Sequence, residues 1–404
     1  MSGWPNIALG SCVREMRGGA SVTDDDLKES GFPVLHKGAI REGGRLVFDR
    51  DGKSHVSEEY ATSKARSVVT SKFVVATLRN LVKTGETLGF IAPVPSGQKF
   101  LLAQGAYGLL LDDKRLDRRY LSHLSNSWVF HKEILKRMVG STQVHIRNND
   151  FLQVPIPLPP LEEQRRIAEV LDRADALRQK RRLALQKLDT LLQSVFLDIF
   201  GDPVKNPRGW PQERMGDLMV IRRGGSPRPI DDYLGGEINW IKIGDATKGD
   251  QIYLDSSKEK IISEGLKKTV FLKSGSLIFA NCGVSLGFAR ILRIDGCIHD
   301  GWLSFEEIPE KRLNKIFLLK ALNSITDHFR RIAPSGTQPN LNTGIMKTFP
   351  MIVPPIDVQT RFAEIVANIE KIRPTIGASE TAVENLFGSV QDRAFKGDLA
   401  FEST

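Results

Sequence analysis

One loop in the second half of the chain gathers three arginines around a pair of glycines. It runs from Arg222 to Arg228 and reads RRGGSPR. A guanidinium group can pair bidentately with a phosphate or with O6 and N7 of guanine. Glycine lets backbone amides approach a phosphate closely. The pattern favours nucleic-acid contact, and a solvated loop joining two strands is the competing interpretation.

Amide side chains supply a second kind of candidate. Asn281 follows an apolar stretch, and residues 337–342 read TQPNLN. Asn and Gln can pair with N6 and N7 of adenine. The same residues could equally stabilise turns, and 337–342 lies where a globular region meets a helical one.

Candidate DNA-contacting residues occur in both halves of the chain. The first half contributes Arg17, Arg79, Lys83, Arg119 and Gln143. The second half contributes Arg222, Arg223, Arg228, Lys242, Asn281, Gln338 and Asn340. Because basic residues often form only a solvated face, the prediction concerns the set more than each member.

Motifs for catalysis are missing from the sequence. Gly52-Lys53-Ser54 ends like a phosphate-binding loop, but Val47 stands where such a loop needs glycine. No Asp/Asn-Pro-Pro-aromatic tetrapeptide and no Gly-x-Gly turn occurs. Cys282, Cys297 and His299 lack a fourth ligand at zinc-finger spacing. We therefore expect no catalytic residue, no cofactor and no metal in this chain.

The distribution of charge indicates where a polyanion would bind. The chain of 404 residues has a formal net charge of +9 and a pI of about 9.4. Residues 161–200 contain eight Lys/Arg and seven Asp/Glu, and residues 356–399 contain five and seven. The positive excess thus lies outside the two helical segments, which favours nucleic acid as a partner. On a chain of this length, the same charge could simply aid solubility.

Three cysteines, far apart in the sequence, suit a reducing compartment without structural disulfides. The N-terminal residues lack the basic stretch and apolar core of a secretory signal. No apolar run approaches 18 residues, so no transmembrane helix is predicted. We expect a cytoplasmic protein without a membrane partner.

The stretch from Pro159 to Phe200 is predicted to form one long helix, ended by Gly201-Asp202-Pro203. Steps of four and three residues mark a seam of Val170, Ala174, Leu177, Arg181, Ala184, Leu188, Leu191 and Val195. This spacing is typical of a coiled coil, and a buried helix of one large domain is the alternative. Arg181, the one charge on the seam, is the predicted site of an inter-helix or inter-subunit salt bridge.

The second half of the chain repeats the first. Trp4-Pro5 and Arg17-Gly18-Gly19 return 206 residues later as Trp210-Pro211 and Arg223-Gly224-Gly225. A second series returns after 195 residues, and it pairs Pro155 with Pro350, Pro159-Pro160 with Pro354-Pro355, Gln164 with Gln359 and Leu191 with Leu386. So many matches at two ungapped offsets indicate an internal duplication.

The duplication predicts an α+β protein with two β-rich domains joined by two long helical segments. The expected bounds are 1–156 and 202–352 for the domains, and 157–201 and 353–404 for the helical segments. Pro374 and Gly377 should divide the second helix into pieces near 356–373 and 379–395. Packed as an antiparallel coiled coil, the helical segments would give the chain pseudo-twofold symmetry.

The repeated motifs resemble the DNA-specificity subunit of type I restriction-modification systems. The residues that carry the resemblance are PLPPLEEQRRIAEVLDRADAL at 157–177, VPPIDVQTRFAEIVANIEKI at 353–372, the GSTQ and SGTQPNLN loops, the WPNIALG and GWPQERMG starts, NWIKIGD at 239–245 and LIFANCG at 277–283. The first half shows no clear counterpart of NWIKIGD. The resemblance covers the whole chain.

The resemblance implies a non-catalytic subunit whose two target-recognition domains each read one half of an asymmetric, bipartite double-stranded DNA target. The helices would set the gap and dock two methyltransferase subunits, and restriction/translocase subunits would join the complex. S-adenosylmethionine and ATP would then be bound by those partners. The expected partner-binding residues are Glu163, Arg166, Arg173, Arg178, Arg181, Leu188 and Leu192.

Two other functions stay open at this point. A fused single-chain methyltransferase or nuclease would need a cofactor or metal motif, which the sequence lacks. A coiled-coil scaffold that binds protein would show no DNA affinity, whereas a DNA-binding chain should lose affinity steeply as salt rises.

Overall fold

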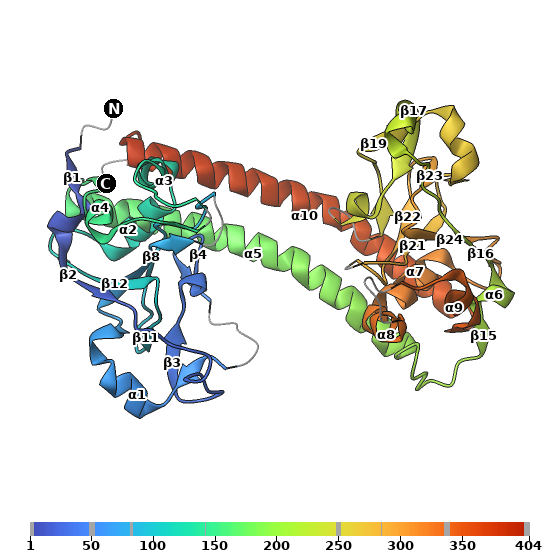
Figure 1. The fold of residues 1–404 in the computed structure, drawn as a ribbon, viewed down its shortest axis with the longest axis horizontal. Coiled ribbons are helices and arrows are strands. Elements are labelled where there is room, and N and C mark those ends of the chain that lie inside the picture. The colour runs from blue at the N-terminus through green and yellow to red at the C-terminus, as the bar shows by residue number, and fades with distance from the viewer. Residues whose placement is uncertain are drawn as a thin grey trace. The chain divides into compact units, whose positions relative to one another are not determined.

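A computed structural model describes residues 4–47, 53–80, 84–141, 143–247, 252–283, 285–334 and 340–399, apart from the side chain of Asp189. The chain forms two compact units (Figure 1). Unit 1 comprises Met1–Arg182 and Ala378–Thr404, and unit 2 comprises Leu183–Gly377. Each unit therefore combines one globular half of the duplication with part of each long helix.

Unit 1 contains two four-stranded sheets. The first has the order β10-β8-β12-β2 and is antiparallel throughout. The second has the order β6-β3-β11-β7, and its central pair β3 and β11 is parallel. The strands are Val13–Gly18 (β2), Phe32–Leu35 (β3), His55–Val56 (β6), Val68–Thr70 (β7), Phe73–Thr77 (β8), Ile91–Pro93 (β10), Lys99–Leu102 (β11) and Ala106–Leu111 (β12).

Unit 2 repeats this topology. Its first sheet has the order β16-β24-β21-β22-β18, in which β18 is an added edge strand, and its second has the order β19-β17-β23-β20 with β17 and β23 parallel. The strands are Val220–Arg223 (β16), Leu234–Ile241 (β17), Tyr253–Leu254 (β18), Glu259–Ile261 (β19), Val270–Leu272 (β20), Leu277–Ala280 (β21), Ala289–Leu292 (β22), Gly296–Ile298 (β23) and Trp302–Glu306 (β24). The predicted α+β fold with two β-rich domains is confirmed.

The structure supplies the counterpart of NWIKIGD that the first half lacks in sequence. Leu35 pairs with Leu102 in unit 1 as Ile241 pairs with Ile298 in unit 2. Residues 34–38 (VLHKG) therefore take the place of residues 240–244 (WIKIG). The match is not visible in the sequence because a buried strand needs only apolar residues, and these vary freely between Val, Leu, Ile and Trp.

Shorter elements frame the sheets at matching places. In each unit, the first strand pairs with the one that precedes a long helix: Asn6–Ala8 (β1) with Pro155–Pro157 (β14), and Gln212–Arg214 (β15) with Pro350–Ile352 (β25). The remaining strands are Ile40–Arg41 (β4), Arg45–Leu46 (β5), Arg79–Asn80 (β9) and Val144–His145 (β13). The 3-10 helices are Leu9–Cys12, Lys37–Ala39, Ala65–Ser67, Ile230–Tyr233, Ile243–Ala246 and Ser263–Lys268.

The short α-helices are Glu58–Ser63 (α1), Arg118–Ser125 (α2), Trp128–Leu135 (α3), Asn148–Leu152 (α4), Met215–Leu218 (α6), Lys315–Ser324 (α7), Thr326–Ile332 (α8) and Thr343–Thr348 (α9). Most of them lie in corresponding pairs, α2 with α7, α3 with α8 and α4 with α9, whereas α1 and α6 match 3-10 helices of the other unit. Asp117 caps α2 and Asn314 caps α7, each by accepting two backbone N–H groups of the first turn. Such caps satisfy amides that have no partner within the helix.

The two long helices are Leu161–Phe200 (α5) and Ile356–Lys396 (α10). Contrary to expectation, Pro374 and Gly377 do not divide α10 into two pieces. Proline removes one backbone hydrogen bond from a helix. The helix nevertheless continues through Pro374, and on either side of it Phe362 and Phe387 are buried in the cores of unit 2 and unit 1.

The predicted seam of α5 is displaced by about one residue. The buried positions include Leu171, Asp175 and Arg178 in unit 1 and Leu192, Phe196 and Phe200 in unit 2. Leu177 and Leu191 are instead 42% and 48% exposed. The reason is that α5 packs against the globular core of each unit as well as against α10, which turns its buried face away from a strict heptad seam.

Ion pairs join the long helices within unit 1, but they do not involve Arg181. Arg178 lies 3.3 Å from Glu384, and Arg182 lies 3.8 Å from Glu380. From the first pair to the second, the residue number rises along α5 and falls along α10, so the two helices run antiparallel there. Arg181 is exposed and makes no ion pair with any residue that the structure describes. The predicted inter-helix salt bridge is therefore made by the neighbours of Arg181, and a salt bridge from Arg181 to another subunit stays a prediction.

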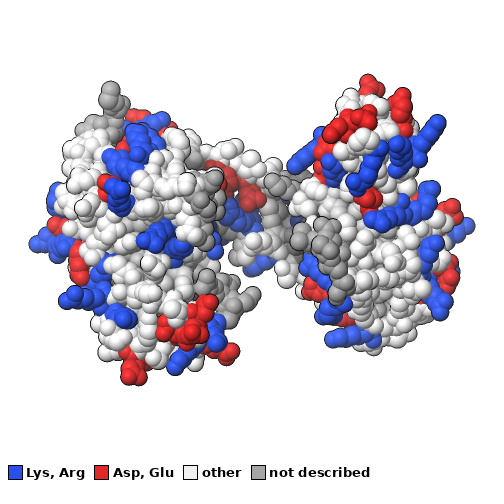
Figure 2. All heavy atoms as spheres, viewed as in Figure 1, with Lys and Arg blue, Asp and Glu red and all other residues white. Residues whose placement is uncertain are grey.

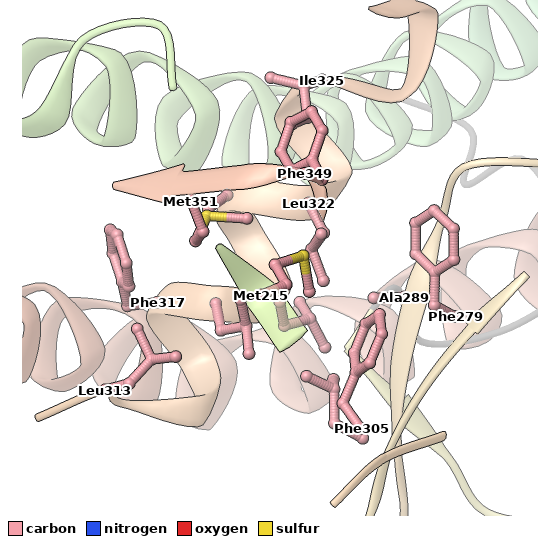
Figure 3. Close-up of a cluster of buried hydrophobic side chains, with 14 of the residues drawn as sticks. Met215, Phe279, Ala289, Phe305, Leu313, Phe317, Leu322, Ile325, Phe349 and Met351 are labelled. Atoms are coloured by element: carbon pink, nitrogen blue, oxygen red, sulfur yellow. The ribbon is translucent and has the colours of Figure 1, made fainter. Parts of the chain in front are cut away.

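Aromatic and aliphatic side chains fill a continuous core in unit 2. Phe196 and Phe200 of α5 pack against Phe317 of α7 and Phe362 of α10, mostly edge to face, with ring centroids 4.7–6.0 Å apart. Figure 3 shows part of this cluster, in which Phe317 lies near Leu313 and Met215 lies among residues from several elements. Burial of such rings supplies much of the stability of a domain. The position of the sheets relative to the helices is fixed by this packing.

A buried glutamine anchors each long helix to its own unit. Gln164 and Gln359 have no exposed surface. The Gln164 amide donates to the carbonyls of Arg115 (2.9 Å) and Pro159 (2.8 Å), and its oxygen accepts the N–H of Asp117 (2.8 Å). These three bonds tie the first turn of α5 to the cap of α2.

The same clamp is present in unit 2. Gln359 donates to the carbonyls of Arg312 (3.0 Å) and Pro354 (2.6 Å) and accepts the N–H of Asn314 (2.8 Å). Each glutamine thus has its hydrogen-bonding groups met by backbone, which is what allows an uncharged amide to be buried.

We predict that Gln359→Ala destabilises unit 2 by about 2–3 kcal/mol, because it leaves one N–H and two carbonyls without partners in a buried place. Gln164→Ala should do the same to unit 1. Urea denaturation followed by far-UV circular dichroism measures both effects. Gln186→Ala is the matched control, since Gln186 is exposed on α5. Equal destabilisation by the control would contradict the clamp.

Candidate nucleic-acid interface

Each unit contains the same arrangement of backbone hydrogen bonds, which we call the frame. It lies where the segments that follow the central strands of the unit's two sheets meet. In unit 1, Leu78 N–H donates to Gly105 (3.3 Å), and Leu78 C=O accepts from Ile146 (3.1 Å). In unit 2, Asn281 makes the same two bonds. Its N–H donates to Gly301 (3.0 Å), and its C=O accepts from Leu341 (2.8 Å).

A third bond completes the frame. Ala103 N–H donates to Leu35 (2.9 Å) in unit 1, and His299 N–H donates to Ile241 (3.0 Å) in unit 2. The residues around this frame can therefore be paired by position. Arg79 corresponds to Cys282, His145 to Asn340, Arg147 to Asn342 and Lys37 to Ile243.

An open groove with basic and aromatic walls lies at the frame of unit 1. Its lining is Arg79, Tyr107, His145, Ile146, Arg147, Asn148, Asn149 and Asp150. Gly105 lies between two cations, since a Cβ there would be 3.2 Å from Lys37 Cδ and 3.6 Å from Arg79 Cδ. Arg79 is exposed and forms no ion pair with a described residue. Gln143 is exposed and directly precedes β13, which pairs with the strand of Arg79.

Three cations gather around a half-buried histidine at the frame of unit 2. Burial lowers the pKa of His299, and the positive charges of Lys242, Arg228 and Arg223 lower it further, whereas Asp300 opposes them. The His299 ring lies 5.5 Å from that of Trp240, and Lys242 Nζ lies 4.6 Å above the Trp240 ring. Lys242 also pairs with Glu259 at 2.6 Å.

Asp300 holds the arginine-rich loop in place. Its carboxylate accepts from Ser226 Oγ (2.9 Å), and its carbonyl accepts from Arg223 Nε (2.9 Å). Arg228 is exposed, and no described residue forms an ion pair with its side chain. The loop is therefore fixed at Arg223 and Ser226 and presents the guanidinium of Arg228.

The glycines of this loop have a different role from the one expected. A Cβ on Gly224 would lie 2.3 Å from the carbonyl oxygen of His299, and one on Gly225 would lie 2.2 Å from that of Lys268. A Cβ on Gly19, the sequence counterpart of Gly225, would lie 2.0 Å from the carbonyl oxygen of Ala103. These glycines allow close packing of the chain on itself, so the prediction that they admit a phosphate is withdrawn.

Several predicted DNA-contacting arginines are engaged within their own unit. Arg17 lies 2.7 Å from Glu15, donates to the carbonyl of Val68 and stacks on Phe73. Arg119 lies 3.0 Å from Asp172 of α5.

Arg222 pairs with Glu306 through two hydrogen bonds, and this pairing raises the pKa of Arg222. Like Arg17 and Arg119, Arg222 neutralises an acid of the fold. We therefore remove Arg17, Arg119 and Arg222 from the proposed interface.

The predicted amides are placed differently from one another. Asn281 has no exposed surface, so it is not available to a base. Asn340 is partly exposed beside it. Lys83 and Gln338 lie outside the described residues, so the structure does not place them.

The expected partner-binding residues also divide into two groups. Arg178 is 5% exposed and Leu192 is 2% exposed, so the fold itself uses both. Arg178 lies 2.8 Å from Asp175 and stacks on Phe387 at 4.3 Å. The others keep at least part of their surface: Glu163, Arg166, Arg173, Arg181 and Leu188.

Of the residues that line the unit 1 groove, sequence reasoning named Arg79 and missed Tyr107, His145, Ile146, Arg147, Asn148, Asn149 and Asp150. It also missed Lys37 beside Gly105. The offset of 195 residues carried a signal for some of them. It places His145 opposite the predicted Asn340, and Arg147 and Asn148 opposite Asn342 and Thr343. Lys37 and Tyr107 lie in stretches where the halves have diverged, and no pattern marked them.

Chemistry other than binding finds little support in the described part of the chain. No group of three or more His, Cys, Asp or Glu residues there could hold a metal ion. Burial, with a smaller effect of Asp300, raises the pKa of the Cys282 thiol, which makes it a poor nucleophile. None of the described helices is long and apolar enough to cross a bilayer.

Basic side chains are spread over the surface of both units. Figure 2 shows Lys and Arg on the visible face of each, with Asp and Glu among them. No single basic patch stands out in this view. The free cations at the shared frame, rather than overall charge, therefore define the candidate interface.

The chain matches the family model for the type I restriction modification DNA specificity domain over residues 1–187 and again over 207–382. It is 22% identical over 387 residues to the EcoKI specificity subunit of Escherichia coli K12, covering 83% of this chain and 82% of that one. It is 22% identical over 384 residues to the StySPI specificity subunit of Salmonella potsdam, covering 83% and 81%.

Two solved structures share the fold. One is a chain from a type I R-M system studied for its complex assembly and conformational transition, with a TM-score of 0.57, 18% identity and 98% of both chains covered. The other is the S subunit of a type I system from M. genitalium, with a TM-score of 0.56, 13% identity and 98% and 96% covered. With one specificity domain in each half, the chain belongs to the family of type I restriction-modification DNA-specificity subunits.

Proposed function

We propose that each unit reads one half of a bipartite DNA target through the side chains around its shared frame. The observation that carries this is that one backbone frame bears two different sets of side chains. Unit 1 presents Arg79, His145 and Arg147, where unit 2 presents Cys282, Asn340 and Asn342. Different donors and acceptors on one scaffold select different bases, so the target is asymmetric.

The chemistry of the two interfaces supports different contacts. Arg79 and Arg147 suit guanine or phosphate, and Tyr107 offers an apolar surface beside them. In unit 2, the exposed Arg228 supplies positive charge near His299, and Asn340 supplies an amide. Each interface combines charge that favours phosphate with groups that can distinguish base edges.

The chain recognises DNA, and the catalytic steps belong to partner subunits in the cytoplasm. Two methyltransferase subunits dock on exposed positions of the long helices, among them Glu163, Arg166, Arg173, Arg181 and Leu188. Those subunits bind S-adenosylmethionine, and restriction/translocase subunits that use ATP complete the assembly. The reason for placing the cofactors there is that the chain carries neither a cofactor motif nor a cluster of metal ligands among its described residues.

The long helices set the gap between the two half-sites in this proposal. Both α5 and α10 contribute to each unit, so a change in their length changes the separation that the units can span. An α-helix rises 1.5 Å per residue.

Sequencing of methylated DNA from cells that hold this chain and its methyltransferase should give one asymmetric target in two parts, with a gap of fixed length. The separation should place both parts on one face of the duplex, about one helical turn apart. Cells with the methyltransferase alone are the control. A single contiguous target would contradict the proposal.

Removal of seven residues from the middle of both α5 and α10 should shorten the gap. The helices would lose about 10 Å each, which corresponds to about three base pairs of B-DNA. The half-site sequences should stay the same. Methylation mapping of the variant complex measures the gap, and an active complex with the original gap would refute the role of the helices as spacers.

The substitutions Arg79→Ala and Arg119→Ala should separate an interface arginine from a structural one. Arg79→Ala should weaken binding to the target duplex about tenfold, since one good base contact is lost. Arg119→Ala should leave binding unchanged and lower the free energy of unfolding by about 0.5 kcal/mol, because its ion pair is partly exposed. Fluorescence anisotropy and urea denaturation measure the two effects. If Arg119→Ala weakened binding and Arg79→Ala lowered only the free energy of unfolding, the interface in unit 1 would be overturned.

A further inference from the structure

Asn281 is a buried polar residue whose hydrogen bonds are only partly satisfied. It has no exposed surface. Its side-chain nitrogen donates to Asn340 Oδ1 at a long 3.4 Å, and its own Oδ1 is buried without a hydrogen-bond partner among the described residues. An amide that is buried in this way destabilises a fold. Its presence therefore needs an explanation other than stability.

The duplicated unit shows that the fold does not require this amide. Leu78 stands at the corresponding position of unit 1, is 1% exposed and makes the same two backbone bonds. The frame is therefore built equally well around an apolar side chain. What differs in unit 2 is the side chain that Asn281 touches.

That side chain, Asn340, is held from two directions at the edge of the interface. Its backbone forms a β-bridge with Cys282. Its side-chain oxygen accepts from Asn281 and keeps a second lone pair, and no described residue accepts a hydrogen bond from its side-chain nitrogen. Arg223 and Asp300 lie near Cys282, because both charges act on the Cys282 thiol. The bridge to Cys282 thus places Asn340 near Arg223.

We propose that Asn340 is the adenine-reading residue of unit 2 and that Asn281 positions its amide for that contact. Reading adenine takes one donor and one acceptor in a fixed plane, directed at N7 and N6. A free Asn side chain on a loop would rotate. The buried Asn281 limits that rotation through Asn340 Oδ1 and leaves the groups needed for adenine. This inference rests on the proposed function, because it assigns one base of the half-site read by unit 2.

The test uses the full complex with its methyltransferase and the mapped target duplex. Binding is measured to the cognate duplex and to a series in which each adenine of either half-site is replaced by 2-aminopurine or by guanine. Asn340→Ala should abolish discrimination at one adenine of the second half-site, a loss of about tenfold in the affinity ratio. Discrimination within the first half-site should stay unchanged.

Asn281→Leu copies the residue of unit 1 and tests positioning directly. It should keep or raise Tm, since it removes a buried amide with an unpaired oxygen, and yet it should reduce discrimination at the same adenine. The double variant with Asn340→Ala should be no worse than Asn340→Ala alone, because both act on one contact. Asn239→Leu is the control, because Asn239 bonds to Asp295 at the far end of β23 and should leave base discrimination intact.

The outcomes separate this inference from the function on which it rests. If the wild-type complex shows no bipartite preference, the proposed function fails. If the wild type discriminates both half-sites but Asn281→Leu leaves every adenine preference intact, the positioning role is overturned. Additive losses in the double variant, or a loss spread over both half-sites, would also overturn it.

Discussion

The fold of each unit depends on one buried glutamine at the start of a long helix. Gln164 and Gln359 join that helix to the preceding proline carbonyl and to the cap of the neighbouring helix, α2 or α7. A buried amide is stable only when its partners are in place, so the clamp permits one arrangement of these elements. The globular core then packs on the same helices, and the interface is built on that core.

The same backbone frame underlies the proposed recognition surface of each unit. The backbone bonds around Leu78 and Asn281 agree between the units, whereas the side chains beside them do not. Backbone bonds constrain geometry without fixing residue identity, so the halves could diverge at the surface while the scaffold stayed the same. The asymmetric recognition that we propose rests on this separation of scaffold and surface.

Charge by itself is a poor guide to the interface. Arg17, Arg119 and Arg222 all neutralise acids of their own unit, and Arg178 is buried between the long helices. A cation that already has a partner gains little from a phosphate, because it must first give that partner up. Free cations such as Arg79 and Arg228 carry the proposed binding, and only their surroundings distinguish them from the rest.

The sequence by itself determined the duplication, the two long helices, the α+β class and the family, because these rest on local periodicity and on repeated motifs such as Pro-Pro and Gln. It also pointed to the arginine-rich loop and the amide segment, which border the frame at which we propose the interface. Only the tertiary structure decided which arginines are free, that Asn281 is buried behind Asn340, and that residues 34–38 match 240–244. The state of the arginines and the burial of Asn281 depend on contacts between residues far apart in the chain. The match between residues 34–38 and 240–244 is hidden because many apolar sequences can form the same buried strand.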